Sequence, residues 1–312
     1  MNASRLATVG VVVHPTKTVG DSLATLRHWA AGHAVEVVAR EAEAARVPGD
    51  VTVLGEDDFL ARVDAVVSLG GDGTMLGAMR LTVGRPVPVL GVNHGNVGFL
   101  VEVSPAELGG ALDRLAEHRF VVEPHSGIEF EHDGTTVMAF NDVVIGADVP
   151  GGSVELDLEV EGNRFGYYRC DALVLATPTG STAYNYAAGG PVISPAADVL
   201  ALTPVAPMSG ISHPIVLPAG DTVRLRQARA EDHALARVDG VATTPYPPGS
   251  VATARLRPDA AQVVRIDPDR HAARSRIKLS LLDLPLRREQ LAELLPSDVR
   301  EDLQNLRGRK VF

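Results

Sequence analysis

Two segments of this chain combine glycines with hydroxyl side chains, a pattern that is typical of phosphate-binding loops. The first is Gly70-Gly71-Asp72-Gly73-Thr74, and the second, at residues 177–184, reads Thr-Pro-Thr-Gly-Ser-Thr-Ala-Tyr. Glycine lets backbone N–H groups come close to an anionic ligand. The carboxylate of Asp72 repels a phosphate, so it needs another task, such as accepting a proton or holding a metal ion. This combination predicts phosphoryl transfer onto a hydroxyl group.

Length, charge and cysteine content exclude several classes of protein. A chain of 312 residues is too long for one typical core, so we expect two domains. The formal net charge of −10 argues against a nucleic-acid partner. The only cysteine, Cys170, excludes an internal disulfide and a cysteine-rich zinc site. No apolar run approaches the roughly 20 residues that span a bilayer, and the N-terminus lacks the regions of a signal peptide. We therefore expect a cytoplasmic protein with no membrane partner.

Residues 1–120 have the alternating pattern of an α/β domain with a parallel, Rossmann-like sheet. Apolar runs predict strands at 6–13, 34–39, 65–69 and 87–92, the last at an edge or an irregular position because it contains prolines. Asp21 is a candidate cap for a helix that ends at Gly32. A capping box, Ser104-Pro105-Ala106-Glu107, predicts another helix.

The pattern changes after residue 120. Residues 154–160 alternate between apolar and acidic side chains and precede a turn at 162–163, which indicates an antiparallel strand with one wet face. We assign residues 121–275 to a second, mainly β-sandwich domain. Residues 276–312 carry leucines at helical spacing and form a predicted, partly helical segment that packs back on the body.

The loop at Gly70 lies between a predicted strand and a predicted helix. The carboxyl end of a parallel strand is where α/β sheets usually bind anions. The alternative is a tight turn in which Asp72 is only the helix N-cap. The loop is not a Walker P-loop, because it has no G-x-x-x-x-G-K-[ST]. A Rossmann dehydrogenase is disfavoured, because the next strand ends in Leu-Gly-Val-Asn without an acid for the ribose.

The Gly70–Thr74 segment matches a GGDGT signature shared by NAD kinases, diacylglycerol and sphingosine lipid kinases, and 6-phosphofructokinases. Further segments resemble NAD kinases and occur in that family's order over about residues 6–285. They are residues 91–100, Asn141-Asp142, Asp171 followed by residues 177–184, Gly189-Gly190-Pro191, and Asp239-Gly240. The chain therefore resembles the NAD kinase family.

This resemblance implies an N-terminal α/β domain and a C-terminal β-sandwich, with the site between them. It also implies transfer of a phosphoryl group from ATP or inorganic polyphosphate to the 2′-hydroxyl of the adenosine ribose of NAD, giving NADP. Family members form homodimers or homotetramers and need a divalent cation, usually Mg²⁺.

The resemblance and the residue types together assign candidate roles. Asp72 is the candidate base that deprotonates the acceptor hydroxyl, with metal binding as a second option. We assign the donor phosphates to Gly70, Gly71 and Thr74. No histidine pair has metal-ligand spacing, so no metal ligand is assigned. The candidate NAD-binding residues are Gly73, Phe99, Asn141, Asp142, Asp171, Thr179, Thr182, Ala183, Tyr184 and Asp239.

Simpler interpretations stay open for several of these residues. Tyr184 and Phe99 can be core aromatics, Asp171 a turn cap, and Asp239-Gly240 an ordinary hairpin turn. The sequence also departs from the family pattern, with Asp142 for glutamate, Ala172 for glycine and Ala187 for serine, and without an arginine in the segment 125–128. Two further functions therefore remain: a catalytically weak NAD(P)-binding sensor and a lipid kinase-like enzyme.

Overall fold

The computed structural model describes residues 6–85, 87–95, 99–228 and 233–272. The chain divides into two compact units, Met1–Ile266 and Asp267–Phe312. In the second unit, the Asp267 carboxylate accepts a hydrogen bond of 3.0 Å from the backbone N–H of Arg270 and so caps a helical turn. The partly helical segment predicted at 276–312 lies outside the described residues.

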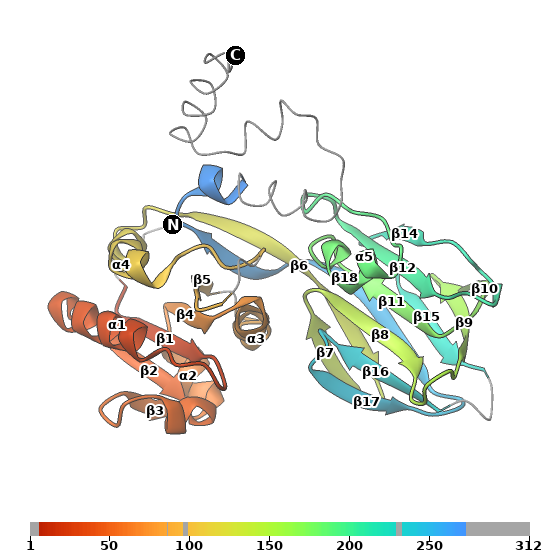
Figure 1. Cartoon of the computed structure of the whole chain (residues 1–312), viewed down its shortest axis with the longest axis horizontal. Helices are drawn as coiled ribbons and strands as arrows, with labels where there is room; N and C mark the ends of the chain where they lie inside the picture. Colours follow the sequence, from red (N-terminus) through yellow and green to blue (C-terminus); the bar gives the residue numbers. More distant parts are fainter. Residues whose placement is uncertain (1–5, 86, 96–98, 229–232, 273–312) are drawn as a thin grey trace, which may run out of the picture. The chain divides into compact units, whose positions relative to one another are not determined.

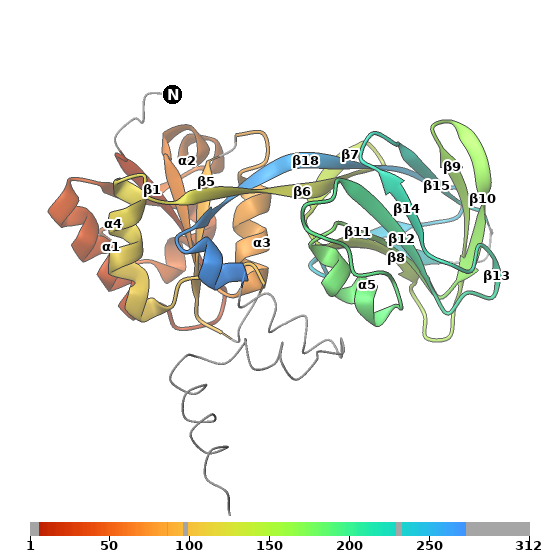
Figure 2. The ribbon, with the colours of Figure 1, turned by 90° about the horizontal axis from the view of Figure 1, so that it is seen from above.

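The first unit begins with an α/β region. Its strands are β1 (Thr8–Val13), β2 (Glu36–Arg40), β3 (Thr52–Leu54), β4 (Ala65–Gly70) and β5 (Pro88–Asn93). Its helices are α1 (Gly20–His33), η1 (Glu41–Arg46), α2 (Glu56–Arg62), α3 (Asp72–Leu81), η2 (Pro105–Glu107) and α4 (Leu108–Ala116). The strands are parallel and lie in the order β5-β4-β1-β2-β3 (Figure 1). Helices α1 and α4 pack into one apolar cluster and α2 and α3 into another, so they cover opposite faces of the sheet (Figure 2).

Most sequence expectations for this region are confirmed. All four predicted strands form, and β1 and β4 are buried along their whole length, as parallel strands covered on both faces should be. The capping box forms: the Glu107 carboxylate accepts a hydrogen bond of 3.0 Å from the backbone N–H of Ser104, and Pro105 follows as the first helical residue. This box fixes where the chain turns into α4.

Two expectations are wrong. Asp21 is not a cap, because α1 begins at Gly20 with Val19 as the N-cap, so Asp21 lies inside the first turn. Strand β5 is not at an edge, because it pairs with β4 on one side and with β18 (Val251–Arg265) on the other. Its proline is tolerated there because Pro88 is the first residue of the strand.

The rest of the first unit is mainly β. Its strands are β6 (Val121–His132), β7 (Thr135–Ala139), β8 (Asp142–Ala147), β9 (Val154–Val160), β10 (Asn163–Cys170), β11 (Ala172–Ala176), β12 (Val199–Val205), β13 (Ser209–Gly210), β14 (Ile215–Pro218), β15 (Val223–Gln227), β16 (Ala234–Val238), β17 (Ala242–Tyr246) and β18. Two short helices, η3 (Gly180–Thr182) and α5 (Tyr184–Ala187), interrupt them. The alternation predicted at 154–160 is confirmed, since β9 is buried at every second residue.

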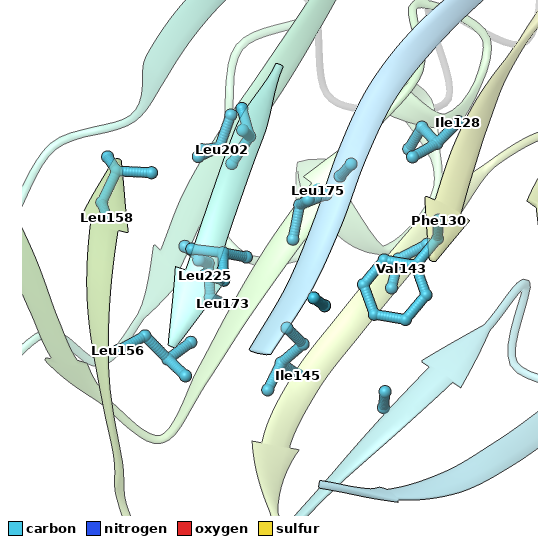
Figure 3. Packing of buried hydrophobic residues seen from close by; sticks show 14 of the residues in the cluster. Ile128, Phe130, Val143, Ile145, Leu156, Leu158, Leu173, Leu175, Leu202 and Leu225 are labelled. Atoms are coloured by element: carbon cyan, nitrogen blue, oxygen red, sulfur yellow. The ribbon is translucent and has the colours of Figure 1, made fainter. Parts of the chain in front are cut away.

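Two sheets enclose the core of this region. One is the six-stranded antiparallel sheet β14-β12-β11-β8-β16-β17. The facing strands include β9, β15 and β18, and side chains from both layers interdigitate, among them Leu156, Leu173 and Leu225 (Figure 3). Burial of a leucine of this kind stabilises the fold by roughly 1.5–3 kcal/mol. The predicted fold class, an α/β region followed by a β-sandwich region, is thus confirmed.

Strand β18 connects the two regions, which the sequence did not predict. Near its start it pairs antiparallel with β15, and near its end it pairs parallel with β5, so strands of both regions belong to one 12-stranded sheet. Strand β6 runs beside β18 over most of its length (Figure 2). No helix in the described part of the chain is both long and apolar enough to cross a membrane.

Candidate active site

The glycine loop lies at the carboxyl end of β4, where it turns into α3. Strand β4 ends at Gly70, and Gly71 is the N-cap of α3. A Cβ atom on Gly70 would lie 2.1 Å from Oγ1 of Thr74, so only glycine fits beneath that hydroxyl. Oγ1 of Thr74 is buried and has no hydrogen-bond partner among the described residues. The first turn of α3 therefore carries backbone N–H groups and a hydroxyl that a bound phosphate could use.

The Asp72 carboxylate is held by a second loop. Its Oδ2 accepts a hydrogen bond of 2.6 Å from the N–H of Phe99, and its Oδ1 accepts bonds of 3.1 and 3.4 Å from those of Leu100 and Val101. Asp72 is the first helical residue, so the interpretation as an N-cap is wrong. A carboxylate has about four acceptor positions. Three are filled, which leaves room for one hydroxyl donor.

Asp239 joins the second region to α3. Its Oδ1 accepts hydrogen bonds from the N–H groups of Phe140, Asn141 and Asp142 at 3.1, 2.7 and 3.2 Å. Its Oδ2 lies 2.5 Å from Nη1 of Arg80, and its side chain is fully buried. Asp239 also has a positive φ of 47° in the hairpin turn between β16 and β17. Asp239 thus has two roles: its backbone forms part of the hairpin turn, and its side chain anchors the loop at 140–142.

Asp142 is a buried carboxyl group beside this anchor. It is 6% exposed, and burial together with the nearby charge of Asp239 raises the pKa of Asp142 to about 6. A backbone hydrogen bond from Tyr184 lowers this pKa in part. Asp142 is therefore a buried carboxyl group with a raised pKa, a property that is common in functional sites.

The loop at 177–184 is built around buried polar groups. Oγ1 of Thr177 donates a hydrogen bond of 2.7 Å to the carbonyl of Phe140 and accepts one of 2.9 Å from the N–H of Gly180. A Cβ on Gly180 would lie 1.9 Å from the carbonyl oxygen of Asn141, so the two loops touch through their backbones. Thr177 and Gly180 thus fix the loop against Asn141 and Asp142.

The residues after Gly180 separate into supporting and exposed groups. Oγ of Ser181 is buried and donates to the carbonyl of Pro178 at 2.6 Å, so it supports the loop. The exposed or half-buried side chains are those predicted to contact a nucleoside, namely Thr179, Thr182, Ala183 and Tyr184. Tyr184 is 45% exposed, so the interpretation as a core aromatic is wrong for this residue.

Two family models match this chain, and its relatives have one activity in common. Residues 3–120 match the model of the ATP-NAD kinase N-terminal domain, and residues 140–266 match that of the ATP-NAD kinase C-terminal domain. An NAD kinase of Gemmatimonas aurantiaca is 37% identical over 223 residues, which cover 70% of this chain and 77% of the relative. An NAD kinase of Sulfurimonas denitrificans is 32% identical over 241 residues, which cover 74% of this chain and 82% of the relative.

The chain belongs to the NAD kinase family. Two solved structures share the fold. One is a yeast NADH kinase complexed with NADH, with a TM-score of 0.79 at 22% identity. The match covers 92% of this chain and 91% of the yeast chain. An NAD kinase from Archaeoglobus fulgidus in complex with ATP has a TM-score of 0.68 at 24% identity, with 88% of this chain and 98% of that chain covered.

One predicted NAD-binding residue of this NAD kinase-family chain lies apart from the others. Asp171 precedes β11 and Thr177 follows it, whereas Asp142 pairs with Ala176 at the Thr177 end. Six residue steps of about 3.3 Å place Asp171 and Thr177 roughly 20 Å apart. Asp171 is exposed at the far end of the strand. Within one chain it does not join the residues around Asp142.

The departures from the family pattern have local explanations. A Cβ atom added to Gly146 would lie only 3.0 Å from Cβ of Ala172. The alanine at 172 fits because residue 146 is a glycine. Ala187 is the last residue of α5 and is exposed, so the change from serine to alanine removes a hydroxyl group from the protein surface and not from the core. Among these three substitutions, only Asp142 changes a buried ionisable group, and the segment 125–128 carries the buried His125 in place of an arginine.

A partly buried ion network beside the loop that holds Asp72 was missed from the sequence. The guanidinium of Arg265 binds both carboxylate oxygens of Glu123 at 2.8 Å, and its Nη1 donates to the carbonyl of Leu100 at 2.6 Å. Although burial alone would raise it, hydrogen bonds from Arg265 and His125 hold the pKa of Glu123 well below its usual range. Glu123 and Arg265 come from neighbouring strands but lie 142 positions apart, so no local pattern could reveal the pair.

His125 continues this network toward the loop at 177–184. Its Nε2 lies 2.7 Å from Oε1 of Glu123, and its Nδ1 lies 3.5 Å from Oγ1 of Thr179. These residues line a cavity of about 290 Å³, together with Pro124, Ser126, Pro178, Pro195 and Ala196. The network thus links Leu100, which helps to hold Asp72, with the predicted nucleoside wall.

A divalent cation fits this family's site in one way. Mg²⁺ is usually held by one or two carboxylates together with the phosphates of its nucleotide. Asp72, which directly follows Gly70 and Gly71, is the carboxylate that can supply such a ligand. Within the described ranges, no group of three or more His, Cys, Asp or Glu residues is placed to hold an ion.

Proposed function

We propose that this member of the NAD kinase family transfers the terminal phosphoryl group of ATP to the 2′-hydroxyl of the adenosine ribose of NAD, giving NADP. The protein is a phosphotransferase, and phosphorylation of NAD is the reaction of the family to which it belongs. The observation that carries the assignment of the site is the Arg80–Asp239 ion pair. It joins the helix that begins at Asp72 to the loop that carries Asn141 and Asp142.

In the proposed mechanism, Asp72 orients the 2′-hydroxyl and accepts its proton. The amides that bind Asp72 leave one acceptor position open, which supports this role. The 2′-oxygen attacks the terminal phosphorus, the bond to the bridging oxygen breaks, and the electron pair stays with ADP. Most of the rate enhancement comes from positioning and from charge neutralisation.

We propose that the donor phosphates lie on Gly70, Gly71 and Thr74, because the helix N-terminus and the unpaired Thr74 hydroxyl suit an anion. Bound Mg²⁺ would neutralise charge on these phosphates, with Asp72 as its ligand from the protein. Inorganic polyphosphate presents the same chemical group and is proposed as a second donor.

The acceptor pocket is proposed to consist of Gly73, Phe99, Asn141, Asp142 and the wall Thr179, Thr182, Ala183 and Tyr184. Asp239 acts on the pocket by holding the loop at 140–142. The exposed ring of Tyr184 offers a face on which a base can stack.

We propose that the protein works as a homodimer or homotetramer. Asp171 lies about 20 Å along β11 from Thr177, so we assign its contact with NAD to the site of a second copy. A cytoplasmic location and the division into domains at residues 120 and 275 stay predictions from the sequence.

The test is NADP formation by the purified full-length chain from NAD, with ATP and polyphosphate supplied separately, each with Mg²⁺. Turnover with ATP that is lost in Asp72→Asn supports the proposal. Binding of NAD without turnover would favour the sensor, and neither binding nor turnover would contradict both. Phosphorylation of a lipid in vesicles, without NADP formation, would favour the lipid kinase.

A further inference from the structure

A cluster of basic side chains lies beside the glycine loop, and the roles proposed above use none of them. His14 and Lys17 follow β1, and His94 follows β5. In the sheet, β1 and β5 are the two strands that flank β4, which ends in the glycine loop. Carboxyl ends of parallel strands meet at one edge of a sheet. The three segments therefore adjoin at the edge where an α/β sheet binds its ligand.

Hydrogen bonds connect this basic cluster to the glycine loop. The N–H of His94 donates to the carbonyl of Gly70 at 2.8 Å. Nζ of Lys17 donates to the carbonyl of His94 at 3.1 Å. Nδ1 of His14 accepts hydrogen bonds from the N–H groups of Thr16 and Lys17 at 3.1 and 3.0 Å. The Lys17 ammonium group is thus two hydrogen bonds away from the carbonyl of Gly70.

The cluster has unused hydrogen-bonding capacity. Because Nδ1 of His14 accepts two N–H groups, the neutral ring carries its proton on Nε2, where it can donate. Nε2 of His94 is buried and has no partner in the part of the chain that the structure describes. An ammonium group has three donors, and the structure gives Lys17 a single side-chain bond among the described residues.

Charge around these groups is mainly positive. Burial and the charge of Lys17 lower the pKa of both histidines, to which Arg46 adds at His14. The charge of His14 acts in the same direction on His94, and only Asp21 in the first turn of α1 opposes it there. In a chain with a net charge of −10, the Lys17 cation and the neutral imidazole rings of His14 and His94 lie next to an uncapped helix N-terminus, and this combination favours an anion.

We propose that Lys17, together with His14 and His94, binds the phosphate chain of the donor, on the phosphates that remain with the leaving group. This inference rests on the proposed function and adds residues to its donor site. When the bond between the terminal phosphorus and the bridging oxygen breaks, the electron pair stays on the departing phosphate chain. The proton of the 2′-hydroxyl passes to Asp72. The ammonium group of Lys17 then neutralises the negative charge that the leaving phosphates gain.

Lysine acylation tests this site without relying on turnover. The chain has three lysines, Lys17, Lys278 and Lys310, so the modified peptides are easily separated by mass spectrometry. The full-length protein is treated with an N-hydroxysuccinimide ester alone and with ATP, inorganic tripolyphosphate or adenosine. We expect ATP and tripolyphosphate, at concentrations that saturate binding in calorimetry, to slow acylation of Lys17 about fivefold or more relative to Lys278 and Lys310. Adenosine should give no protection. Equal acylation of Lys17 with and without saturating ATP would overturn the proposal.

Kinetics of two charge-matched variants give the second test. Lys17→Met keeps the side-chain stem and removes the charge, and we expect it to raise the KM for ATP about tenfold or more without changing the KM for NAD. Arg62→Gln is the control. Arg62 ends α2 and pairs with Glu36, the first residue of β2, so it lies at the amino ends of the parallel strands, away from the glycine loop. Equal changes in both variants, or equal changes in the KM for both substrates, would contradict the proposal.

The two tests separate this inference from the proposed function. Protection of Lys17 by ATP in a protein that makes no NADP would keep the phosphate site and remove the kinase assignment. NADP formation without protection of Lys17 would keep the kinase assignment and remove the phosphate site at Lys17. Protection by ATP but not by tripolyphosphate would show that the nucleoside, rather than the phosphate chain, covers Lys17, and would also overturn the inference.

Discussion

Arg80 and Asp239 lie 159 positions apart in the chain, yet Nη1 of Arg80 is 2.5 Å from Oδ2 of Asp239. Arg80 belongs to the helix that begins at the candidate base. Asp239 binds the backbone of the loop that carries Asn141 and Asp142. One ion pair therefore ties the helix of the candidate base Asp72 to the loop of the proposed acceptor-binding residues Asn141 and Asp142.

Loss of this ion pair should affect both stability and substrate binding. We expect Arg80→Leu to lower the free energy of unfolding by about 3 kcal/mol, because it leaves the buried charge of Asp239 without its cation. The KM for NAD should also rise as the loop at 140–142 loosens. Urea denaturation and steady-state kinetics measure the two effects. Arg62→Leu removes an exposed pair with Glu36 and should cost less than about 1 kcal/mol. Equal losses in both variants would contradict a special role for Arg80.

Replacement of the candidate base should separate chemistry from binding. We expect Asp72→Asn to lower the single-turnover rate about 100-fold or more, because the amide cannot accept the hydroxyl proton. The side-chain NH2 group would also face backbone N–H groups of residues 99–101, so urea denaturation must accompany the assay. NAD affinity, measured by calorimetry, should remain close to that of the natural chain. An unchanged single-turnover rate would remove Asp72 from this role.

Asp142 should make stability depend on pH. Its pKa is raised to about 6 in the folded protein, from an ordinary value near 4. Between these values the folded state keeps a proton that the unfolded chain has released, so the free energy of unfolding falls as the pH rises through this window. Above pH 7, Asp142→Asn should be more stable than the natural chain by about 1–3 kcal/mol.

Urea denaturation of both chains at pH 5 and pH 8 tests this expectation. The difference in stability between the two pH values should shrink in Asp142→Asn, although NAD binding should weaken. An identical pH dependence in the two chains would show that Asp142 does not titrate in this range.

The contact between the two loops leaves no room for a side chain at residue 180. A Cβ there would lie 1.9 Å from the carbonyl oxygen of Asn141, so Gly180→Ala should cost about 3 kcal/mol or more. Gly109→Ala is the matched control, because its Cβ would meet nothing within 4 Å in helix α4. It should instead raise stability by about 0.5–1 kcal/mol. Thermal or urea unfolding of the two variants gives the comparison.

Arg265 should act on the rate through the loop that holds Asp72. It binds the carbonyl of Leu100, whose N–H group binds the Asp72 carboxylate. We expect Arg265→Met to lower kcat about 10- to 100-fold, with a smaller change in the KM values, because a shift of about 1 Å in the base is costly. Arg257→Met on the same strand is the control, since Arg257 forms an exposed pair with Glu129. Loss of NAD affinity rather than kcat would contradict this role.

The sequence determined the local elements and the residues with chemical potential. Continuous apolar runs produced the buried strands β1 and β4, and the capping box produced the turn into α4, because such signals act within a few residues. The glycine loop and the hydroxyl-rich segment at 177–184 were predicted as site residues from their types and spacing, and Asp142 from the resemblance to the NAD kinase family.

Only the tertiary structure decided how these segments meet. It placed β5 inside the sheet, joined both regions through β18, and separated Asp171 from Thr177 by the length of β11. It also made the pairs Arg80–Asp239 and Arg265–Glu123, which are 159 and 142 positions apart. The energy of such pairs depends on burial and on distances set by strand pairing across the chain, and no local pattern of residues encodes these quantities.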